Sequence, residues 1–271
     1  MKTRIISAVV ASALLVAALI LNSFFSITVT VCLALLSALA SYEMLHNTGC
    51  VGKKAPVFAA MLFSAAVQFA YSGYFGNVIL LTLVYVLFVV IFAVFDHTNF
   101  GERQITMALS MPIVISYAFS SLDTIINSDD GHGLFYFVLL FNFSCVSDIC
   151  AYFVGSKLGR HKLSPVISPK KTIEGSVGGL IGSCIGTVII CIVYNHCFDA
   201  TVSLPILLAV TPLLSILGML GDLFASAIKR NYGIKDYGNI MPGHGGVLDR
   251  TDSILLIAPA LAFILKYTTF A

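Results

Sequence analysis

Long apolar segments recur along the whole chain, and polar residues gather in the short stretches between them. A helix needs roughly 20 mostly apolar residues to cross a bilayer, and nine segments come close to that length. This pattern predicts an all-α, polytopic integral membrane protein with about nine transmembrane helices. The segments lie at about 5–21, 27–45, 56–73, 78–95, 105–121, 133–153, 174–194, 203–224 and 254–270.

The distribution of basic residues supports this number of spans and predicts their orientation. With a cytoplasmic N-terminus, nine spans place fourteen of the fifteen lysines and arginines on the cytoplasmic side and leave only Lys266 near the opposite side. Cytoplasmic loops of membrane proteins carry such an excess of positive charge. The first segment resembles a signal peptide, but apolar segments continue after it, so we interpret it as a span that is retained.

Composition agrees with a membrane protein and narrows its partners. The chain is 58% hydrophobic and only 10% charged, whereas soluble domains carry about 25% charged residues. A net charge of +2 is too small to indicate nucleic-acid binding. The seven cysteines form no C-x-x-C pair, and we interpret them as small buried hydrophobic residues. We expect a single transmembrane domain over 1–271, with N-terminal spans in 1–130, catalytic spans in 133–271, and long cytoplasmic loops at 155–173 and 229–252.

Four acidic residues lie inside or at the ends of apolar spans near the predicted cytoplasmic side, namely Asp148, Asp222, Asp249 and Asp252. A charge at membrane depth costs at least ~2.5–3.5 kcal/mol on insertion scales, so each is a candidate functional residue. The alternative for any single acid is a structural ion pair with a neighbouring lysine or arginine. Clustered carboxylates, with few histidines and no suitable cysteine, favour a hard cation such as Mg²⁺.

Residue spacing brings some of these acids together with polar neighbours. Asp249 and Asp252 share one helical face if the last helix begins near Leu248. Asp222 and Ser226 lie four residues apart and therefore also share a face. We expect the helices that carry the acids to bring their carboxylates towards the cytoplasmic ends.

Two polar segments have features of phosphate sites. In segment 241–246, His244 stands between glycines, whose backbone N–H groups can approach an anion closely. The basic loop 155–173 leads into a helix start, where the N-terminal N–H groups attract anions. The alternatives are a flexible turn for the first segment and contact with anionic lipid headgroups for the second. We interpret most glycines in 175–186 as serving close helix packing.

Residues 226–252 match a long and specific pattern, S-x-x-K-R-x4-K-D-x-G-x3-P-x-H-G-G-x-x-D-R-x-D. On these residues the chain resembles the bacterial phosphatidate cytidylyltransferase (CDP-diacylglycerol synthase) family. Two upstream segments, D-x-x-A-Y-x-x-G and S-P-K-K-T-x-E-G, resemble further motifs of that family. The clear match covers roughly 145–255. Met241 and Ile173 depart from the residues that are common in the family.

The resemblance implies transfer of the cytidylyl group of CTP to phosphatidate, giving CDP-diacylglycerol and pyrophosphate for phospholipid synthesis, with Mg²⁺ as cofactor. It implies a multi-pass protein of the bacterial cell (inner) membrane, with an active site that faces the cytoplasm, and a homodimer. We expect Asp222 and Asp249 to lead the metal ligands, with Asp148 and Asp252 next. The expected catalytic residues are these two leading acids with Lys229, Arg230, Lys235, His244 and Arg250. The expected residues that bind substrate or phosphate are Tyr152, Ser168, Lys170, Lys171, Ser226, Gly245 and Gly246.

Two other classes of function remain open at this point. One keeps the fold and changes the substrate: a CTP-dependent polyprenol kinase, or a cytidylyltransferase for another lipid such as an ether lipid. The other is a membrane transporter, in which glycines and charges also interrupt spans. The transporter is disfavoured because the acids and the basic loops gather on one predicted side and no inverted repeat is visible.

Overall fold

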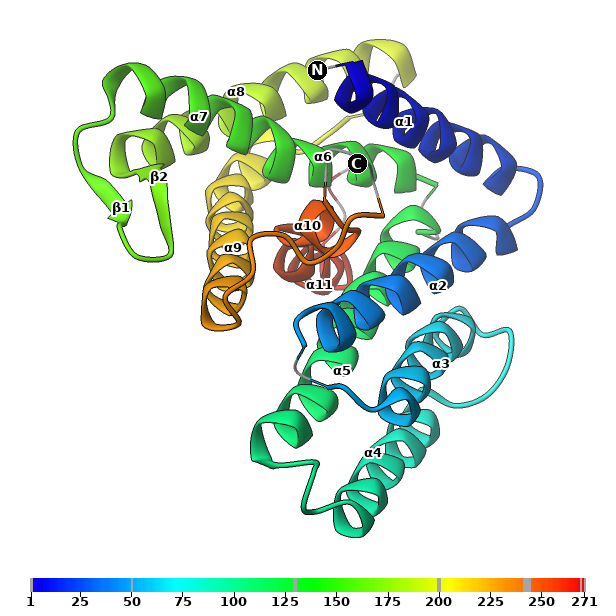
Figure 1. The fold of residues 1–271 in the computed structure, drawn as a ribbon. Coiled ribbons are helices and arrows are strands. Elements are labelled where there is room, and N and C mark those ends of the chain that lie inside the picture. The colour runs from blue at the N-terminus through cyan, green and yellow to red at the C-terminus, as the bar shows by residue number, and fades with distance from the viewer. Residues whose placement is uncertain are drawn as a thin grey trace. The chain divides into compact units, whose positions relative to one another are not determined.

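The structure is a computed structural model that describes residues 2–49, 51–128, 131–198, 201–240, 245–268 and 270 (Figure 1). The chain forms two compact units, and the boundary between them falls inside helices α5 and α9. Unit 1 contains Met1–Asp123 and Lys229–Thr251, and unit 2 contains Thr124–Ile228 and Asp252–Ala271.

Helices dominate the described residues, as the sequence predicts. The early helical elements are α1 (Lys2–Asn22), α2 (Ile27–Tyr42), the π-helix η1 (Glu43–Asn47), α3 (Lys54–Tyr71), α4 (Val78–Phe95) and α5 (Glu102–Ile126). The later ones are α6 (Gly133–Phe141), the π-helix η2 (Asn142–Val146), α7 (Ser147–Leu158), α8 (Ile173–Phe198), α9 (Leu204–Asn231), α10 (Leu248–Thr251) and α11 (Ile254–Leu265). Two short strands, β1 (Lys162–Ser164) and β2 (Ser168–Thr172), complete the set.

The described residues contain seven helices that are long and apolar enough to cross a membrane. The continuous segments Ile27–Asn47 and Gly133–Leu158 each count as one of the seven, and Ser12–Asn22 and Ile254–Leu265 are shorter apolar helices. Seven predicted spans coincide with the long helices and the first and last overlap the two shorter ones, so the expected all-α, multi-pass membrane architecture is confirmed. The total of nine crossings and the cytoplasmic N-terminus remain predictions.

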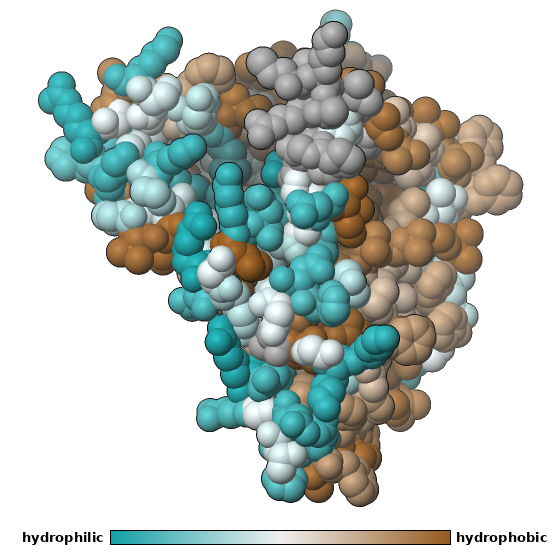
Figure 2. Space-filling model, in the orientation of Figure 1, coloured by the Kyte–Doolittle hydropathy of each residue, from teal (hydrophilic) through white to brown (hydrophobic). Residues whose placement is uncertain are grey.

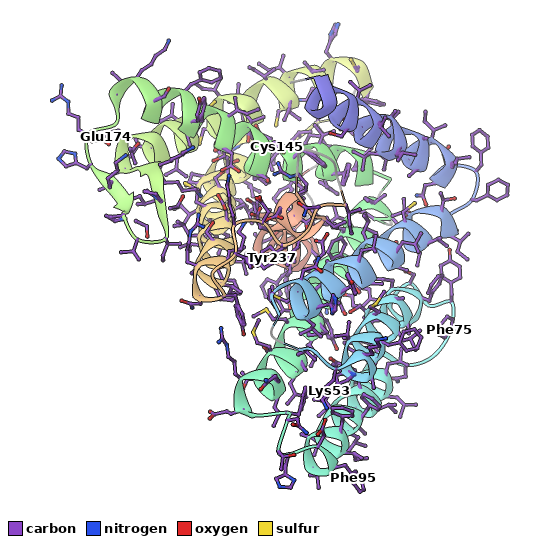
Figure 3. All side chains as sticks on the ribbon, viewed as in Figure 1. Lys53, Phe75, Phe95, Cys145, Glu174 and Tyr237 are labelled. Carbon is purple, nitrogen blue, oxygen red and sulfur yellow. The ribbon has the colours of Figure 1, made fainter. Side chains whose placement is uncertain are left out.

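The outer surface of the helices is apolar, as lipid contact requires. Phe75 and Phe95 project away from the helices (Figure 3) and are 54% and 86% exposed. In the face shown in Figure 2, hydrophobic side chains cover α2 to α4, whereas hydrophilic side chains cover the β1–β2 hairpin. Of the described cysteines, Cys191 is buried, but Cys145 and Cys197 are exposed, contrary to the prediction.

Unit 1 packs around an apolar core with a polar seam between its helices. Leu45, Phe63 and Tyr85 belong to the buried cluster that joins α3 to its neighbours. Beside it, Ser64 exchanges a 2.6 Å hydrogen bond with Ser41 and accepts one of 3.0 Å from Ser116. Small hydroxyl residues of this kind let helices approach closely in a membrane and bond across the interface.

In unit 2, glycines of α8 bring this helix into close contact with α7. A Cβ added at Gly178 would overlap Val154, and one added at Gly182 would overlap Cys150. The contacts confirm that these glycines serve helix packing, as the sequence analysis proposed.

The basic loop before α8 contains an antiparallel β-hairpin, which the sequence analysis did not predict. The hairpin ends in a well-capped helix start, because the Thr172 hydroxyl accepts the backbone N–H of Gly175 at 3.1 Å. Glu174 turns back to the hairpin, where its carboxylate pairs with the His161 ring at 2.6 Å. The loop is thus tied at both ends to the start of α8.

Candidate active site residues

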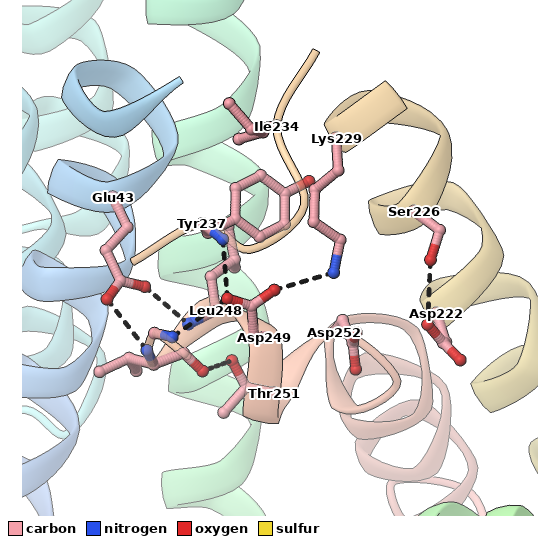
Figure 4. A network of polar contacts seen from close by, with 12 residues as sticks. Glu43, Asp222, Ser226, Lys229, Ile234, Tyr237, Leu248, Asp249, Thr251 and Asp252 are labelled. Carbon is pink, nitrogen blue, oxygen red and sulfur yellow. Dashed lines mark hydrogen bonds and ion pairs between the residues drawn. The ribbon is translucent and has the colours of Figure 1, made fainter. Parts of the chain in front are cut away.

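Asp222 in unit 2 is held by two side chains. Lys171, from strand β2, forms an ion pair with Asp222, in which Nζ and Oδ2 are 2.6 Å apart. The Ser226 hydroxyl donates to Asp222 Oδ1 at 3.3 Å (Figure 4), so the predicted contact across one turn of α9 is confirmed. The Asp222 and Lys171 side chains are 25% and 22% exposed, but the ammonium nitrogen of Lys171 is itself buried.

The other two acids of unit 2 lie on elements that pack near this pair. Asp148 is exposed on α7 and interacts electrostatically with Lys171 and Asp222. Asp252 directly follows α10, and its backbone contacts the site where a Cβ at Gly221 would stand. Unit 2 therefore brings the carboxylates of Asp148 and Asp222 close enough to interact, and the convergence of the Asp252 carboxylate with them remains a prediction.

Asp249 organises the polar segment of unit 1. Lys229 Nζ donates to Asp249 Oδ1 at 2.8 Å, while the backbone N–H groups of Tyr237 and Gly246 donate to Oδ2 at 2.7 and 3.0 Å (Figure 4). The Asp249 side chain is only 3% exposed and that of Lys229 12% exposed. A buried ion pair of this kind requires that the remaining lone pairs be satisfied, and here the backbone satisfies them.

Glu43 also binds the polar segment that carries Asp249, through the backbone of the two residues before Asp249. Its two carboxylate oxygens accept the backbone N–H groups of Val247 at 3.0 Å and Leu248 at 2.9 Å. The Glu43 side chain is fully buried, and it lies in the π-helix that ends the second span. The N–H groups at the start of α10 are thereby paired, although α10 is too short to stand alone.

The predicted cations fall into two groups. Lys229 and Lys171 are each paired with an acid and partly buried. Other predicted residues lie on the exposed surface of the described residues, and these are Tyr152, Lys170, Arg230, Lys235 and Arg250. Ser168 is half-buried at the start of β2. His244 falls outside the described residues, together with the rest of 241–244.

One geometric expectation is wrong. The sequence analysis put Asp249 and Asp252 on one face of a continuous last helix, but α10 ends at Thr251 and α11 begins at Ile254. Asp252 lies in the turn that follows α10, and Asp249 belongs to unit 1 whereas Asp252 belongs to unit 2. Two residues that are three positions apart lie on the same helical face only if the helix between them is unbroken.

The donor chemistry fits a magnesium ion that also binds the substrate. Within the described residues, no group of three or more His, Cys, Asp or Glu side chains could hold a metal ion unaided. Mg²⁺ does not need such a cage, because it is usually bound by one or two carboxylates together with water and substrate phosphates. Asp222 and Asp148, both accessible, are carboxylates of the required type.

Sequence reasoning missed Glu43, although a signal for it was present. Glu43 is an acid near the end of the apolar segment 27–45, so the rule that selected the other four acids applies to it equally. Its role could not be read from the pattern, because its backbone partners follow 204 and 205 positions later in the chain.

Comparison with known proteins agrees with the resemblance. The sequence model of the cytidylyltransferase family matches residues 2–268. A phosphatidate cytidylyltransferase of Staphylococcus haemolyticus (strain JCSC1435) is 48% identical over 133 residues, which are 49% of this chain and 50% of that protein. A phosphatidate cytidylyltransferase of Bacillus subtilis (strain 168) is 43% identical over 195 residues, 69% of this chain and 65% of that protein. The chain thus spans about half the length of the first relative and just under two thirds of the second.

Proposed function

We propose that this chain, which belongs to the cytidylyltransferase family, transfers the cytidylyl group of CTP to phosphatidate and releases pyrophosphate. The observation that carries the proposal is its identity of 43% and 48% to bacterial proteins named phosphatidate cytidylyltransferase. The ordered charge pairs of both units support it, because a reaction between two polyanions needs fixed cations.

The reaction needs no covalent intermediate on the protein. An oxygen of the phosphatidate phosphate forms a bond to the α-phosphorus of CTP, and the bond from that phosphorus to the oxygen bridging to the β-phosphate breaks. The products are CDP-diacylglycerol and pyrophosphate. The protein's task is to bring two anions together and to stabilise the charge on the leaving pyrophosphate, which is positional and electrostatic work.

The paired lysines suit this task because acids hold them in place. Lys229 is fixed by Asp249 and Lys171 by Asp222, so neither side chain must be ordered when a phosphate binds. We propose that these two lysines neutralise substrate phosphates. The exposed cations are proposed to complete the neutralisation, with His244 and the neighbouring Gly245 as further phosphate contacts, whereas the N–H of Gly246 is donated to Asp249.

Mg²⁺ is the proposed cofactor, with Asp222 and Asp249 as leading ligands and Asp148 and Asp252 as further ligands or partners of the cations. When bound, the ion would stabilise negative charge on the phosphates. Because CTP is cytosolic and phosphatidate lies in the bilayer, we propose an active site at the cytoplasmic face of the bacterial cell (inner) membrane. The family resemblance also implies a homodimer.

The test is an assay of the purified full chain in lipid–detergent micelles. CTP labelled at the α-phosphate is supplied with phosphatidate and Mg²⁺, and the expected result is labelled CDP-diacylglycerol with one pyrophosphate released per lipid. EDTA should stop the transfer. Release of CDP with a polyprenol acceptor would instead identify a kinase, and labelling of an ether-lipid phosphate alone would identify a different acceptor. Absence of transfer to any lipid would contradict the proposal.

A further inference from the structure

We infer that Glu43 is a positioning residue for the proposed transfer, which acts by holding the segment that carries Asp249. The inference rests on the proposed function, and it adds a residue from the second span to a site otherwise built from the later part of the chain. Within the described residues, the observed hydrogen bonds of Glu43 go to backbone N–H groups, so we infer that its effect on the reaction passes through Asp249 and its partner Lys229.

Three successive backbone N–H groups show how the two acids share the segment. The N–H of Gly246 donates to Asp249, and those of Val247 and Leu248 donate to Glu43 (Figure 4). Asp249 thus closes its own turn from within, and Glu43 fixes that turn to the π-helix η1. Hydrogen bonds to a buried, charged acceptor are stronger than neutral ones, so the pairing restricts the turn.

Two glycines leave the room that Glu43 occupies. A Cβ built on Gly238 or on Gly246 would overlap the Glu43 carboxylate. Both residues have negative φ, so backbone conformation does not demand glycine at either position. Close approach of Glu43 therefore accounts for them. Gly245 differs, because its φ of +87° lies in the left-handed region, which favours glycine for conformational reasons.

The close approach of Glu43 explains why glycines stand at 238 and 246 without invoking a bound ligand. The sequence analysis interpreted both Gly245 and Gly246 as phosphate contacts. The N–H of Gly246 is already donated to Asp249, and the Cα of Gly246 faces Glu43. Gly246 thus lets two acids from distant parts of the sequence converge on one turn, which places Asp249 and, through the 2.8 Å ion pair, the Lys229 ammonium group.

The experiment compares Glu43→Gln with Glu102→Gln in the purified full chain. Glutamine keeps the size of Glu43 but turns an N–H₂ group toward one of two backbone donors. We expect kcat to fall about 10- to 100-fold, because one charge-assisted bond is lost and the other weakened. The KM values for CTP and phosphatidate should change by less than about threefold, since substrate contacts remain. Glu102 is exposed at the start of α5, and its variant should match the wild type.

Hydrogen–deuterium exchange supplies a readout that does not depend on activity. In Glu43→Gln the amides of 245–251 should exchange at least about tenfold faster than in the wild type, whereas those of α3 should be unchanged. A general loss of protection would mean that Glu43 serves the fold alone and would overturn the positioning role. An unchanged kcat together with unchanged exchange would overturn it as well.

A second pair of variants tests the contact with glycine directly. Gly238→Ala should lower kcat because its Cβ displaces the Glu43 carboxylate, and Glu43→Asp should partly restore kcat in the double variant because the shorter acid withdraws. Strictly additive losses would count against the inference. If the wild type is active and the losses are additive, only the role of Glu43 is overturned. If the wild type transfers nothing from CTP, the proposed function itself is overturned.

Discussion

The observed contacts of Asp249 and its proposed role as a metal ligand compete for the same two oxygen atoms. Oδ2 accepts two backbone N–H groups, and Oδ1 accepts Lys229. A metal ion that binds Asp249 must therefore share or replace the lysine at Oδ1, because giving up the backbone bonds would release the turn. The proposed assignment of Asp249 as a metal ligand keeps the Lys229 ammonium group in place if the ion and the lysine share Oδ1.

Both roles predict that Asp249→Asn abolishes the transfer. The amide removes the negative charge that a metal and Lys229 need, and its N–H₂ group faces donors at one oxygen position. We expect kcat/KM to fall at least about 100-fold, which corresponds to about 2.7 kcal/mol of lost transition-state stabilisation. The assay uses detergent-purified protein with Mg²⁺. Near-normal turnover of this variant would contradict the proposal that Asp249 is a leading metal ligand.

The matched control for charge loss is Lys53→Ala. Lys53 pairs with Asp96 at 3.0 Å, and the lysine side chain is 46% exposed. Hydrogen bonds from Asn99 and Lys53 hold the pKa of the Asp96 carboxyl below its usual range, but exposed pairs of this kind contribute little to stability. We expect turnover and the apparent melting temperature to stay at wild-type values.

The ion pair of Lys171 with Asp222 allows a different test. If Asp222 served only to hold Lys171, the double variant Lys171→Met/Asp222→Asn would be no worse than Lys171→Met alone. If Asp222 also binds Mg²⁺, as proposed, the double variant should be at least about tenfold slower than Lys171→Met. The Mg²⁺ concentration for half-maximal rate should rise only in variants that lack Asp222. If adding Asp222→Asn to Lys171→Met does not slow the enzyme further, Asp222 serves only to hold Lys171.

At the scale of elements, the apolar pattern predicted where the seven long helices lie but not how the polar segments fold. Length and hydropathy suffice for α4, whose observed bounds Val78–Phe95 equal the predicted 78–95. The β1–β2 hairpin escaped prediction because its strands have three and five residues and are too short to show a period of two. The break after α10 escaped because spacing alone does not reveal where a helix stops.

The fit between α7 and α8 predicts a sharp difference between neighbouring positions of α8. Gly182→Leu places a side chain where Cys150 lies, so the helices must separate. We expect the apparent melting temperature to fall by several degrees, in line with about 1–3 kcal/mol for overpacking. Ile181→Leu is the control, because Ile181 is 57% exposed on the outer face of the same helix. Equal stability of the two variants would contradict the contact.

In the candidate site, too, the sequence predicted contacts between neighbouring residues but not contacts between distant segments. Asp222, Ser226 and Lys171 could be nominated from local spacing and charge, and the structure joins them within unit 2. Glu43 could only be nominated as a costly charge in a span, because its partners lie far along the chain. Contacts between distant segments depend on how helices pack, which a single sequence does not encode in any local period.

For the whole molecule, the relative sides of the internal loops depend only on whether the seven long helices cross the membrane, and not on the short helices at either end. The end of α5 and the β1–β2 hairpin lie on either side of the span Gly133–Leu158 along the chain, and they must face opposite sides of the membrane if that span crosses. Only the sides of the two termini depend on α1 and α11. The expected cytoplasmic position of the basic loops can therefore be tested without deciding between seven and nine crossings.

We predict that a cysteine at Lys162 reacts with a membrane-impermeant maleimide only after the cytoplasmic face is opened, whereas one at Asn127 reacts in intact cells. Lys162 lies in strand β1 within the basic hairpin, and Asn127 is exposed just after α5. The native cysteines are first replaced by serine or alanine, and the cysteine-free protein must retain the transfer. Labelling of Lys162→Cys from outside would invert the topology. It would also separate the basic loop from cytosolic CTP, so the proposed reaction could not take place at these residues.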